Sequence, residues 1–250
     1  MTTLHQLKLK YFTDAWQTLE HQATQEHWSY AQFLLALSEG ELSRREQNRI
    51  ARALSEAQLP YAKSWTNFEF SHVPSLNAAA LLEFAQTTTW LGTAHNILIF
   101  GPSGTGKTHA SAALGRSMVE LGHRVKFMGA TALVQQLQAA KLQLELPTAL
   151  SKLDRFELLI IDDLGYVKKS EAETSVLFEL IAHRYERKSL LITANQPFSQ
   201  WDSIFSDSMM TVAAIDRLVH HATIFEMQAD SFRKQAAAKR TAEAKTNPSP

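Results

Sequence analysis

The segment from Gly101 to Thr108 contains the residue pattern of this chain that points most directly to a chemical role, the binding of phosphate groups. It reads Gly-Pro-Ser-Gly-Thr-Gly-Lys-Thr, the Gly-x4-Gly-Lys-Thr pattern of a phosphate-binding loop. Small residues let backbone N–H groups close around phosphate oxygens, and a following helix points its positive end at the anion. In this pattern Lys107 reaches the β and γ phosphates and the Thr108 hydroxyl ligates Mg²⁺. The predicted ATP and Mg²⁺ site comprises Gly101, Pro102, Ser103, Gly104, Thr105, Gly106, Lys107 and Thr108.

A pair of aspartates follows an apolar run farther along the chain. Residues 157–161 predict a buried strand, and Asp162 and Asp163 come directly after it. One carboxylate beside a phosphate loop can hold the hydration shell of Mg²⁺, and a second can polarise the attacking water. The sequence therefore predicts Asp162 as a metal residue, together with Thr108, and Asp163 as a catalytic residue. The alternative is that one aspartate only caps the helix expected after Gly165.

Three further residues are candidates for catalysis. Asn195 follows another apolar run, and its amide could orient water beside a γ-phosphate. Arg217 and Arg233 offer the positive charge that stabilises the transition state of phosphoryl transfer. Spacing leaves alternatives open, because Asn before Gln-Pro is a common turn and the arginines could pair with Asp216 or Asp230 at the surface.

The part of the chain that holds these residues alternates between two patterns. From about residue 77, short apolar runs are separated by helical patterns. The expected strands are 96–100, 124–127, 157–161, 189–193 and 222–225. Strands that alternate with helices favour a parallel sheet covered on both faces. The predicted fold is therefore α/β, with a parallel five-stranded sheet flanked by helices.

The first part of the chain has only helical patterns. Apolar residues recur at helical spacing over 4–19, and a capping-box pattern at Ser29 begins a second helix, expected to stop near Gly40. A third helix is expected over 42–58, followed by a linker or extended arm over 60–74. The predicted organisation is a small all-α N-terminal domain at 1–66, an ATPase domain at 67–233 and a basic, disordered tail at 234–250.

Composition excludes several classes of protein. The 250 residues contain 25 Lys and Arg against 25 Asp and Glu, so no overall charge draws the chain to nucleic acid or membrane. Cysteine is absent, which rules out disulfides and thiolate metal sites. No apolar run approaches the ~18 residues of a membrane helix, and we expect a cytoplasmic protein without a membrane partner. His220 and His221 have no zinc-binding spacing around them, so the sequence predicts no zinc site.

With these motifs in order, the chain resembles an AAA+ ATPase. Within that class it is similar to the IstB-type helper ATPases of bacterial insertion sequences, which are relatives of the DnaC helicase loader. The resemblance covers nearly the whole chain. It rests on residues 96–108, 160–165, 191–195, 215–218 and 231–233, and on the helical N-terminal region with Arg44, Arg45 and Arg49.

The resemblance implies roles that spacing alone does not. Asp162 and Asp163 match the Walker B pair, and Asn195 matches the sensor position. Arg217 matches the arginine finger, which acts on the ATP of a neighbouring subunit, and Arg233 matches the second sensor, which acts within its own subunit. Many AAA+ proteins have Asp-Glu in place of this Asp-Asp pair, and the shorter side chain fits a slow switch better than a fast motor. No separate helical lid is evident after Arg233.

The resemblance also implies partners. The family couples ATP binding to assembly of a homo-oligomer on duplex DNA, then recruits and stimulates a partner transposase and helps select the target site. A DnaC-like loader of the replicative helicase shares the ATPase motifs and is the main alternative. A small-molecule P-loop kinase is a third possibility, although the arginine-rich lid that it would need is not evident.

Local groups of basic residues are the candidates for DNA binding. Arg45, Arg49 and Arg52 share one face of the third expected helix, with Arg44 beside them. Lys168–Lys169, in the loop after the aspartate pair, form a second group. A solvated face is the alternative for the helix, because three glutamates interleave with its arginines: Glu41, Glu46 and Glu56.

Overall fold

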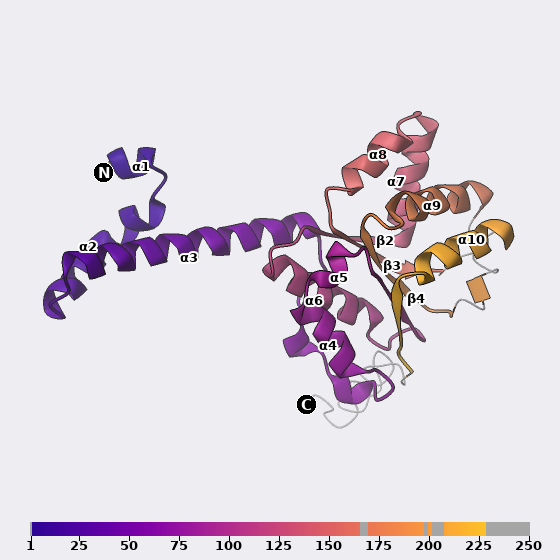
Figure 1. Cartoon of the computed structure of the whole chain (residues 1–250), viewed down its shortest axis with the longest axis horizontal. Coiled ribbons are helices and arrows are strands. Elements are labelled where there is room, and N and C mark those ends of the chain that lie inside the picture. The colour runs from indigo at the N-terminus through magenta and orange to yellow at the C-terminus, as the bar shows by residue number, and fades with distance from the viewer. Residues whose placement is uncertain (1, 166–169, 198–199, 202–207, 229–250) are drawn as a thin grey trace, which may run out of the picture. The chain divides into compact units, whose positions relative to one another are not determined.

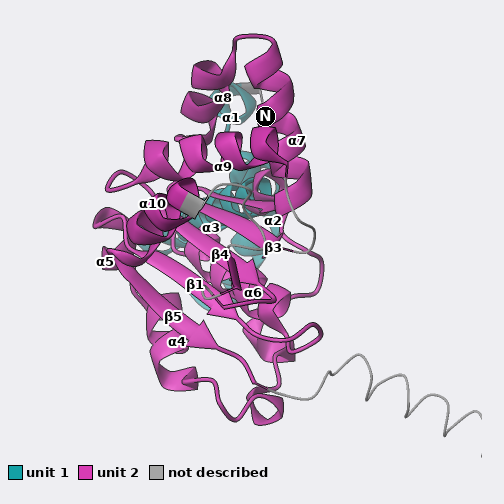
Figure 2. Cartoon of the chain, turned by 90° about the vertical axis from the view of Figure 1, so that its right-hand side faces the viewer, with its two compact units in different colours: residues 1–53 teal, residues 54–250 magenta. Residues whose placement is uncertain are grey.

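A computed structural model describes residues 2–165, 170–197, 200–201 and 208–228. The chain divides into two compact units, residues 1–53 and 54–250, which Figure 2 shows in teal and magenta. The division lies inside the third expected helix, and a functional boundary near residue 66 stays a prediction. The segment 234–250, predicted to be a disordered tail, lies outside the described residues.

The N-terminal unit is helical, as expected, but its helices begin and end at other residues. They are α1 (Thr2–Gln6), α2 (Lys10–Gln25) and α3 (Tyr30–Ala57), whose last residues belong to the second unit. The first expected helix is broken because Lys8 adopts a left-handed φ of 56°. The capping box at Ser29 is present, since its backbone nitrogen donates to Gln32 Oε1 at 2.7 Å and its Oγ accepts from the Gln32 nitrogen at 3.3 Å.

The prediction that a helix stops near Gly40 was wrong, because α3 runs through this residue without a break. A Cβ atom at Gly40 would lie 2.0 Å from the ring of Tyr11, so a glycine is needed for α2 and α3 to pack. Glu41 strengthens the same contact by accepting a hydrogen bond from the Tyr11 backbone nitrogen at 2.7 Å. The glycine that suggested a helix end is instead a packing site within the helix.

The second unit contains a five-stranded sheet, and all of its strand pairs are parallel (Figure 1). The strand order is β2-β3-β4-β1-β5. The strands are β1 (Asn96–Phe100), β2 (Val125–Gly129), β3 (Leu158–Leu164), β4 (Ser189–Ala194) and β5 (Ala222–Glu226). The α-helices are α4 (Ala78–Gln86), α5 (Thr89–Gly92), α6 (Lys107–Glu120), α7 (Ala130–Leu142), α8 (Leu146–Leu153), α9 (Glu171–Arg184) and α10 (Ser208–Val219).

Helices cover both faces of this sheet. Alternate strand residues such as Leu98 and Ile192 join one buried core with apolar residues of α7, α8, α9 and α10. Helix α6 packs on the other face, where a Cβ atom at Gly115 would come within 2.6 Å of Ile160. The predicted α/β fold with a parallel five-stranded sheet is therefore confirmed. Among the described residues, no helix is both long and apolar enough to cross a membrane.

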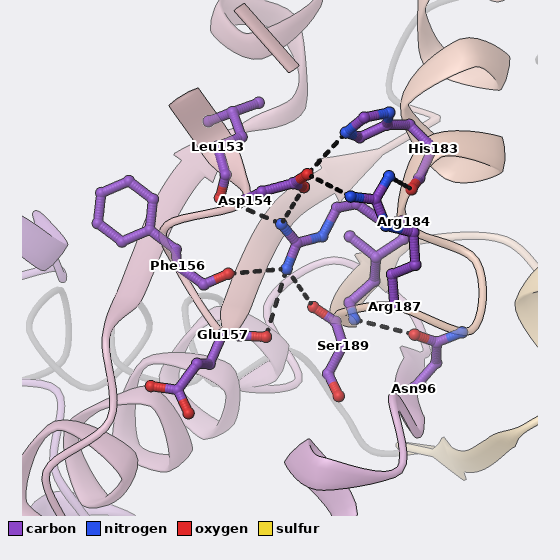
Figure 3. Close-up of polar contacts among 10 residues, drawn as sticks. Asn96, Leu153, Asp154, Phe156, Glu157, His183, Arg184, Arg187 and Ser189 are labelled. Atoms are coloured by element: carbon purple, nitrogen blue, oxygen red, sulfur yellow. Dashed lines mark hydrogen bonds and ion pairs between the residues drawn. The ribbon is translucent and has the colours of Figure 1, made fainter. Parts of the chain in front are cut away.

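The amino-terminal edge of the sheet is organised by a buried arginine, Arg184, which is only 1 % exposed (Figure 3). Its guanidinium donates to four backbone carbonyls, at 3.0 to 3.3 Å: those of Leu153, Phe156, Glu157 and Ser189. Asp154 Oδ1 lies 3.8 Å from Arg184 Nη1 and supplies the counter-charge. Burial lowers the pKa of Arg184 to about 10, so the side chain stays charged at neutral pH. One side chain thus connects the segment that precedes β3 to the first residue of β4.

Candidate nucleotide-binding site

The phosphate loop lies between β1 and α6, at the carboxyl edge of the sheet. Gly101 has a φ of 152°, and a Cβ atom there would lie 2.2 Å from the carbonyl oxygen of Met227. Gly106, at φ 100°, directly precedes Lys107, the first residue of α6. Lys107 is 6 % exposed, and its Nζ donates to the carbonyls of Gly101 at 2.7 Å and Pro102 at 2.8 Å. The carbonyls of the loop therefore hold the Lys107 ammonium close to the loop, at the amino-terminal end of α6.

Asp162 lies on β3 beside the loop, where two hydroxyl groups donate to it. Thr108 Oγ1 donates to Asp162 Oδ2 at 3.0 Å, and Thr193 Oγ1 donates to Oδ1 at 2.7 Å. Burial raises the pKa of the Asp162 carboxyl, whereas both hydrogen bonds act to lower it. A hydroxyl and a carboxylate are the hard oxygen donors that Mg²⁺ prefers, so the Thr108 and Asp162 pair fits this ion.

Asp163 is held differently from its neighbour, because it is exposed and adopts a left-handed φ of 62°. The β3–β4 register shifts between Ile161 and Leu164, and Asp163 lies within this irregularity. Its backbone nitrogen donates to Thr193 Oγ1 at 2.9 Å, and its Oδ1 accepts from Asn195 Nδ2 at 2.8 Å. The bulge thus directs two consecutive carboxylates to different partners.

Asn195 connects the loop to the second aspartate. Its Oδ1 accepts from Lys107 Nζ at 2.8 Å, while its Nδ2 donates to Asp163. The structure therefore brings together three distant segments of the sequence, which contribute Lys107 and Thr108, Asp162 and Asp163, and Asn195. Their chemical roles are taken up under the proposed function.

Sequence reasoning missed Thr193, which is 1 % exposed and bonds both aspartates. It lies inside the apolar run of β4. In the sequence it looks like one more β-branched residue of a strand, so its hydroxyl attracts no notice. The available signal was its position two residues before Asn195, since alternate strand residues share one face of a sheet.

The wall of the site facing the loop was not predicted either, because residues 60–74 were expected to form only a linker or an extended arm. A cavity of about 250 Å³ lies between the phosphate loop and this segment, and six segment residues line it: Lys63, Asn67, Phe68, Glu69, His72 and Val73. The segment is anchored on α6, where His109 Nε2 lies 2.9 Å from the Ser64 carbonyl and Trp65 Nε1 donates to Ser117 Oγ at 3.0 Å. Phe68 packs edge-on against His109, with ring centroids 5.2 Å apart.

Comparison with known proteins identifies the family. Residues 2–240 match the sequence profile of the IstB-like ATP binding proteins. The chain belongs to the IstB-like ATP binding protein family. One relative, a putative insertion sequence ATP-binding protein of Sinorhizobium fredii, is 51% identical over 94% of this chain and 78% of its own length. The insertion sequence IS21 putative ATP-binding protein of Pseudomonas aeruginosa is 33% identical over 92% of this chain and 86% of its own.

Solved structures support the fold of this IstB-like protein. The DnaC helicase loader superposes with a TM-score of 0.52 at 21% identity, over 60% of this chain and 86% of that one. AMPPCP-bound DnaA of Aquifex aeolicus gives a TM-score of 0.57 at 19% identity, over 77% and 58% of the two chains. The predicted class, a P-loop ATPase with the AAA+ fold, is confirmed.

Of the two predicted catalytic arginines of this IstB-like chain, the structure describes Arg217. Arg217 is on α10, where its Nη1 donates to the Ala213 carbonyl at 2.8 Å and its guanidinium lies 5.2 Å from the Phe178 ring centroid. It is not among the residues that line the cavity, and no ion pair with Asp216 is present in the described part of the chain. Arg233 lies outside the described residues.

The predicted DNA-binding arginines of α3 are mostly paired with acids of their own unit. Arg44 bonds Asp14 at 2.7 Å, Arg45 bonds Glu41 at 2.7 Å, and Arg49 bonds Glu46 at 2.6 Å. Arg52 is exposed. The positive charge of these arginines is therefore partly neutralised. This pairing favours the alternative interpretation, in which this side of α3 is an ordinary solvent-exposed face. The other predicted pair, Lys168 and Lys169, lies outside the described residues.

Proposed function

We propose that this chain is an ATP-dependent switch that assembles on duplex DNA and recruits and stimulates a partner transposase, helping to select the target site. The observation that carries the proposal is the connected path from Lys107 through Asn195 to Asp163, in two hydrogen bonds of 2.8 Å. A residue that bonds both the phosphate lysine and the proposed water-polarising carboxylate can couple the presence of a γ-phosphate to the hydrolytic group. The insertion-sequence relatives supply the context of transposition.

Within this proposal each residue has one task. The loop residues bind the phosphates of ATP, with the nucleoside directed toward the wall formed by residues 63–73. Thr108 and Asp162 would hold Mg²⁺, which would supply charge neutralisation at the phosphates. Asp163 polarises the attacking water, and Asn195 orients it. Arg233 is assigned to sense the nucleotide of its own subunit.

Arg217 is proposed to act on the ATP of a neighbouring subunit. The support is that Arg217, on α10, is not among the residues that line the cavity of its own chain. A site completed by a second copy makes ATP a link between subunits, which favours a homo-oligomer. An arginine placed in this way stabilises the transition-state charge and is worth about 10³-fold or more in rate.

Mixing two inactive variants tests the arrangement. Lys107→Ala should not bind ATP but keeps Arg217, whereas Arg217→Ala should bind ATP but hydrolyse it slowly. If the finger acts between subunits, an equal mixture on DNA should hydrolyse ATP faster than either variant alone. The matched control mixes Arg217→Ala with the double variant Lys107→Ala/Arg217→Ala, which supplies no finger and should give no recovery. Failure of the first mixture to recover would place the finger within its own subunit.

Assembly and partner are tested separately. Sedimentation with duplex DNA should show larger assemblies with ATP than with ADP, and equal monomers in both would contradict the switch. The N-terminal region at 1–66 and the tail at 234–250 are the proposed contacts for DNA and partner. Capture of a transposase encoded in the same element supports this function, whereas capture of the replicative helicase would favour the DnaC-like alternative. Acceptor-independent ATP hydrolysis stimulated by DNA would exclude a small-molecule kinase.

A further inference from the structure

Three side chains that can ligate a metal ion meet at the amino-terminal edge of the sheet. Glu186 Oε1 lies 3.8 Å from His220 Nδ1 and 3.8 Å from His221 Nε2. The three ligand atoms all lie within 4.8 Å of one another, and the side chains are about half exposed. Within the described ranges this is the one group of three such side chains. The sequence predicted no metal site at the two histidines, because the third possible ligand, Glu186, lies in a turn more than thirty residues earlier.

The backbone of both histidines is fixed by hydrogen bonds. His220 directly follows α10, and its backbone nitrogen donates to the Asp216 carbonyl at 3.0 Å. The carbonyl of His221 accepts from the Asn96 nitrogen at 2.7 Å, which joins the start of β5 to the start of β1. Glu186 lies in the turn between α9 and β4, in the same unit as α10.

We propose that Glu186, His220 and His221 form a binding site for a zinc-class divalent cation. Two imidazoles and one carboxylate are a ligand set that zinc uses in proteins, with a fourth position left for water. At metal–ligand distances of about 2.0 to 2.2 Å, tetrahedral ligand atoms lie about 3.4 Å apart. The two glutamate–histidine separations of 3.8 Å are close to this value, the third pair also lies within 4.8 Å, and exposed side chains can rotate to close the difference.

Tyr185 provides a partner for the site. Its hydroxyl lies 2.7 Å from His220 Nδ1, and the two rings are 5.9 Å apart. If His220 ligated the ion through Nδ1, this hydroxyl would give up its contact with His220 and keep its hydrogen bond to the Glu186 carboxylate. Hydrogen-bonding groups just outside the ligands orient them and typically change metal affinity by about 10- to 100-fold.

The ion would link the end of α10 to the turn that follows α9. Arg217 lies three residues before His220 and packs on Phe178 of α9, so the same helix pair carries the proposed finger. The cation site and the phosphate loop lie at opposite edges of the parallel sheet, since His221 precedes β5 whereas Gly101 follows β1. Metal binding here should therefore be independent of nucleotide binding.

The test is a titration of the full chain, without an affinity tag, with ZnCl₂ in the absence of nucleotide. Isothermal calorimetry should give one zinc ion per chain for the unmodified protein. His220→Ala and His221→Ala should each weaken binding by about tenfold or more, and Glu186→Gln should also weaken it. His21→Ala is the matched control, because His21 is exposed on α2 and contacts Gln25 of the same helix at 3.1 Å, and this variant should bind zinc normally.

Two further measurements decide the outcome. Zinc should raise the Tm of the unmodified protein but not that of His221→Ala, and Co²⁺ should give a visible tetrahedral spectrum that His221→Ala lacks. Lys107→Ala should keep the zinc site, which separates failure of this proposal from failure of the nucleotide site. Zinc affinity that is unchanged in all three ligand variants, or lost in Lys107→Ala, would overturn the assignment.

Discussion

The hydroxyl of Thr193 donates to Asp162 Oδ1 at 2.7 Å and at the same time accepts from the backbone nitrogen of Asp163 at 2.9 Å. One buried side chain of β4 thereby orients the proposed metal carboxylate and fixes the bulge that turns the next carboxylate outward. Thr108 donates to the other oxygen of Asp162, so both of its oxygens are engaged by hydroxyls. Thr193 is consequently a positioning residue, which acts through the two aspartates.

Replacing Thr193 by valine keeps the shape of the side chain and removes the hydroxyl. A hydrogen bond to a charged group is worth about 1.5 to 3 kcal/mol, so kcat for ATP hydrolysis should fall by about 10- to 100-fold. The affinity for ATP should change little, because the phosphate loop is untouched. Steady-state kinetics and equilibrium nucleotide binding measure the two quantities separately.

Thr193→Ser is the matched control for this prediction. Serine retains the hydroxyl and should recover most of kcat, although it loses a buried methyl group. A purely structural role would lower the Tm of both variants and leave kcat of the folded enzyme unchanged. That pattern would remove Thr193 from the proposed mechanism.

Asp162→Asn should stabilise the nucleotide-free protein at neutral pH while it abolishes hydrolysis. Burial raises the folded-state pKa of Asp162 above its unfolded value. The folded state then holds this proton more tightly, so the free energy of unfolding falls as pH rises from the unfolded pKa through the folded pKa. Above that window the ionised carboxylate lowers stability, and asparagine removes this cost.

The measurement for Asp162→Asn is the Tm of both proteins across a pH series without nucleotide. The difference in Tm should be largest near neutral pH and shrink toward the ordinary pKa of aspartate, about 3.9. A variant that is less stable at every pH would mean that the two threonine hydrogen bonds outweigh burial.

Local patterns in the sequence were sufficient to predict the strands and the phosphate loop. Buried parallel strands are short apolar runs, so β1 was predicted with its exact bounds of 96–100 and the others to within three residues at either end. Strand β3 extends farther than expected, because the bulge lets pairing resume at Leu164 beyond the two aspartates. Polar residues at 162 and 163 had marked the end of the apolar run, although not the end of the strand.

Features that depend on contacts between distant segments were not predictable in this way. Gly40 looked like a helix end because the ring of Tyr11 that requires a glycine there lies 29 positions earlier. The aromatic segment around Phe68 has no periodicity, and only its contact with His109 shows that it forms a wall of the cavity. Glu186 joins the two histidines by the same kind of tertiary contact.

Arg184→Met should strongly destabilise the second unit. The change leaves Asp154 without its buried counter-charge and removes donors from four carbonyls at the start of β3 and β4 (Figure 3). Breaking a buried pair in this way costs about 3 to 5 kcal/mol, which corresponds to a fall in Tm on the order of 10 °C. Thermal and urea unfolding measure the effect.

Arg187→Met is the matched control for the buried arginine. Arg187 also bonds Asp154, at 3.3 Å, but its side chain is 59 % exposed. An exposed ion pair contributes about 1 kcal/mol or less, so this variant should unfold close to the unmodified protein. Equal losses of stability in both variants would show that the carbonyl contacts of Arg184 add nothing.

Arg45→Ala/Arg49→Ala should flatten the salt dependence of DNA binding. Each phosphate contact contributes about −0.9 to the slope of log K against log salt concentration, so losing two should reduce the slope by about 1.8. Because Arg49 is paired with Glu46 at 2.6 Å, Glu46→Gln should release Arg49 and strengthen DNA binding at low salt.

Arg155→Ala/Arg187→Ala is the control, because it removes two exposed arginines of the second unit and should leave the slope unchanged. Fluorescence anisotropy with duplex DNA across a salt series measures all four proteins. An unchanged slope in the first variant, or an equal fall in the control, would move the DNA contact away from α3.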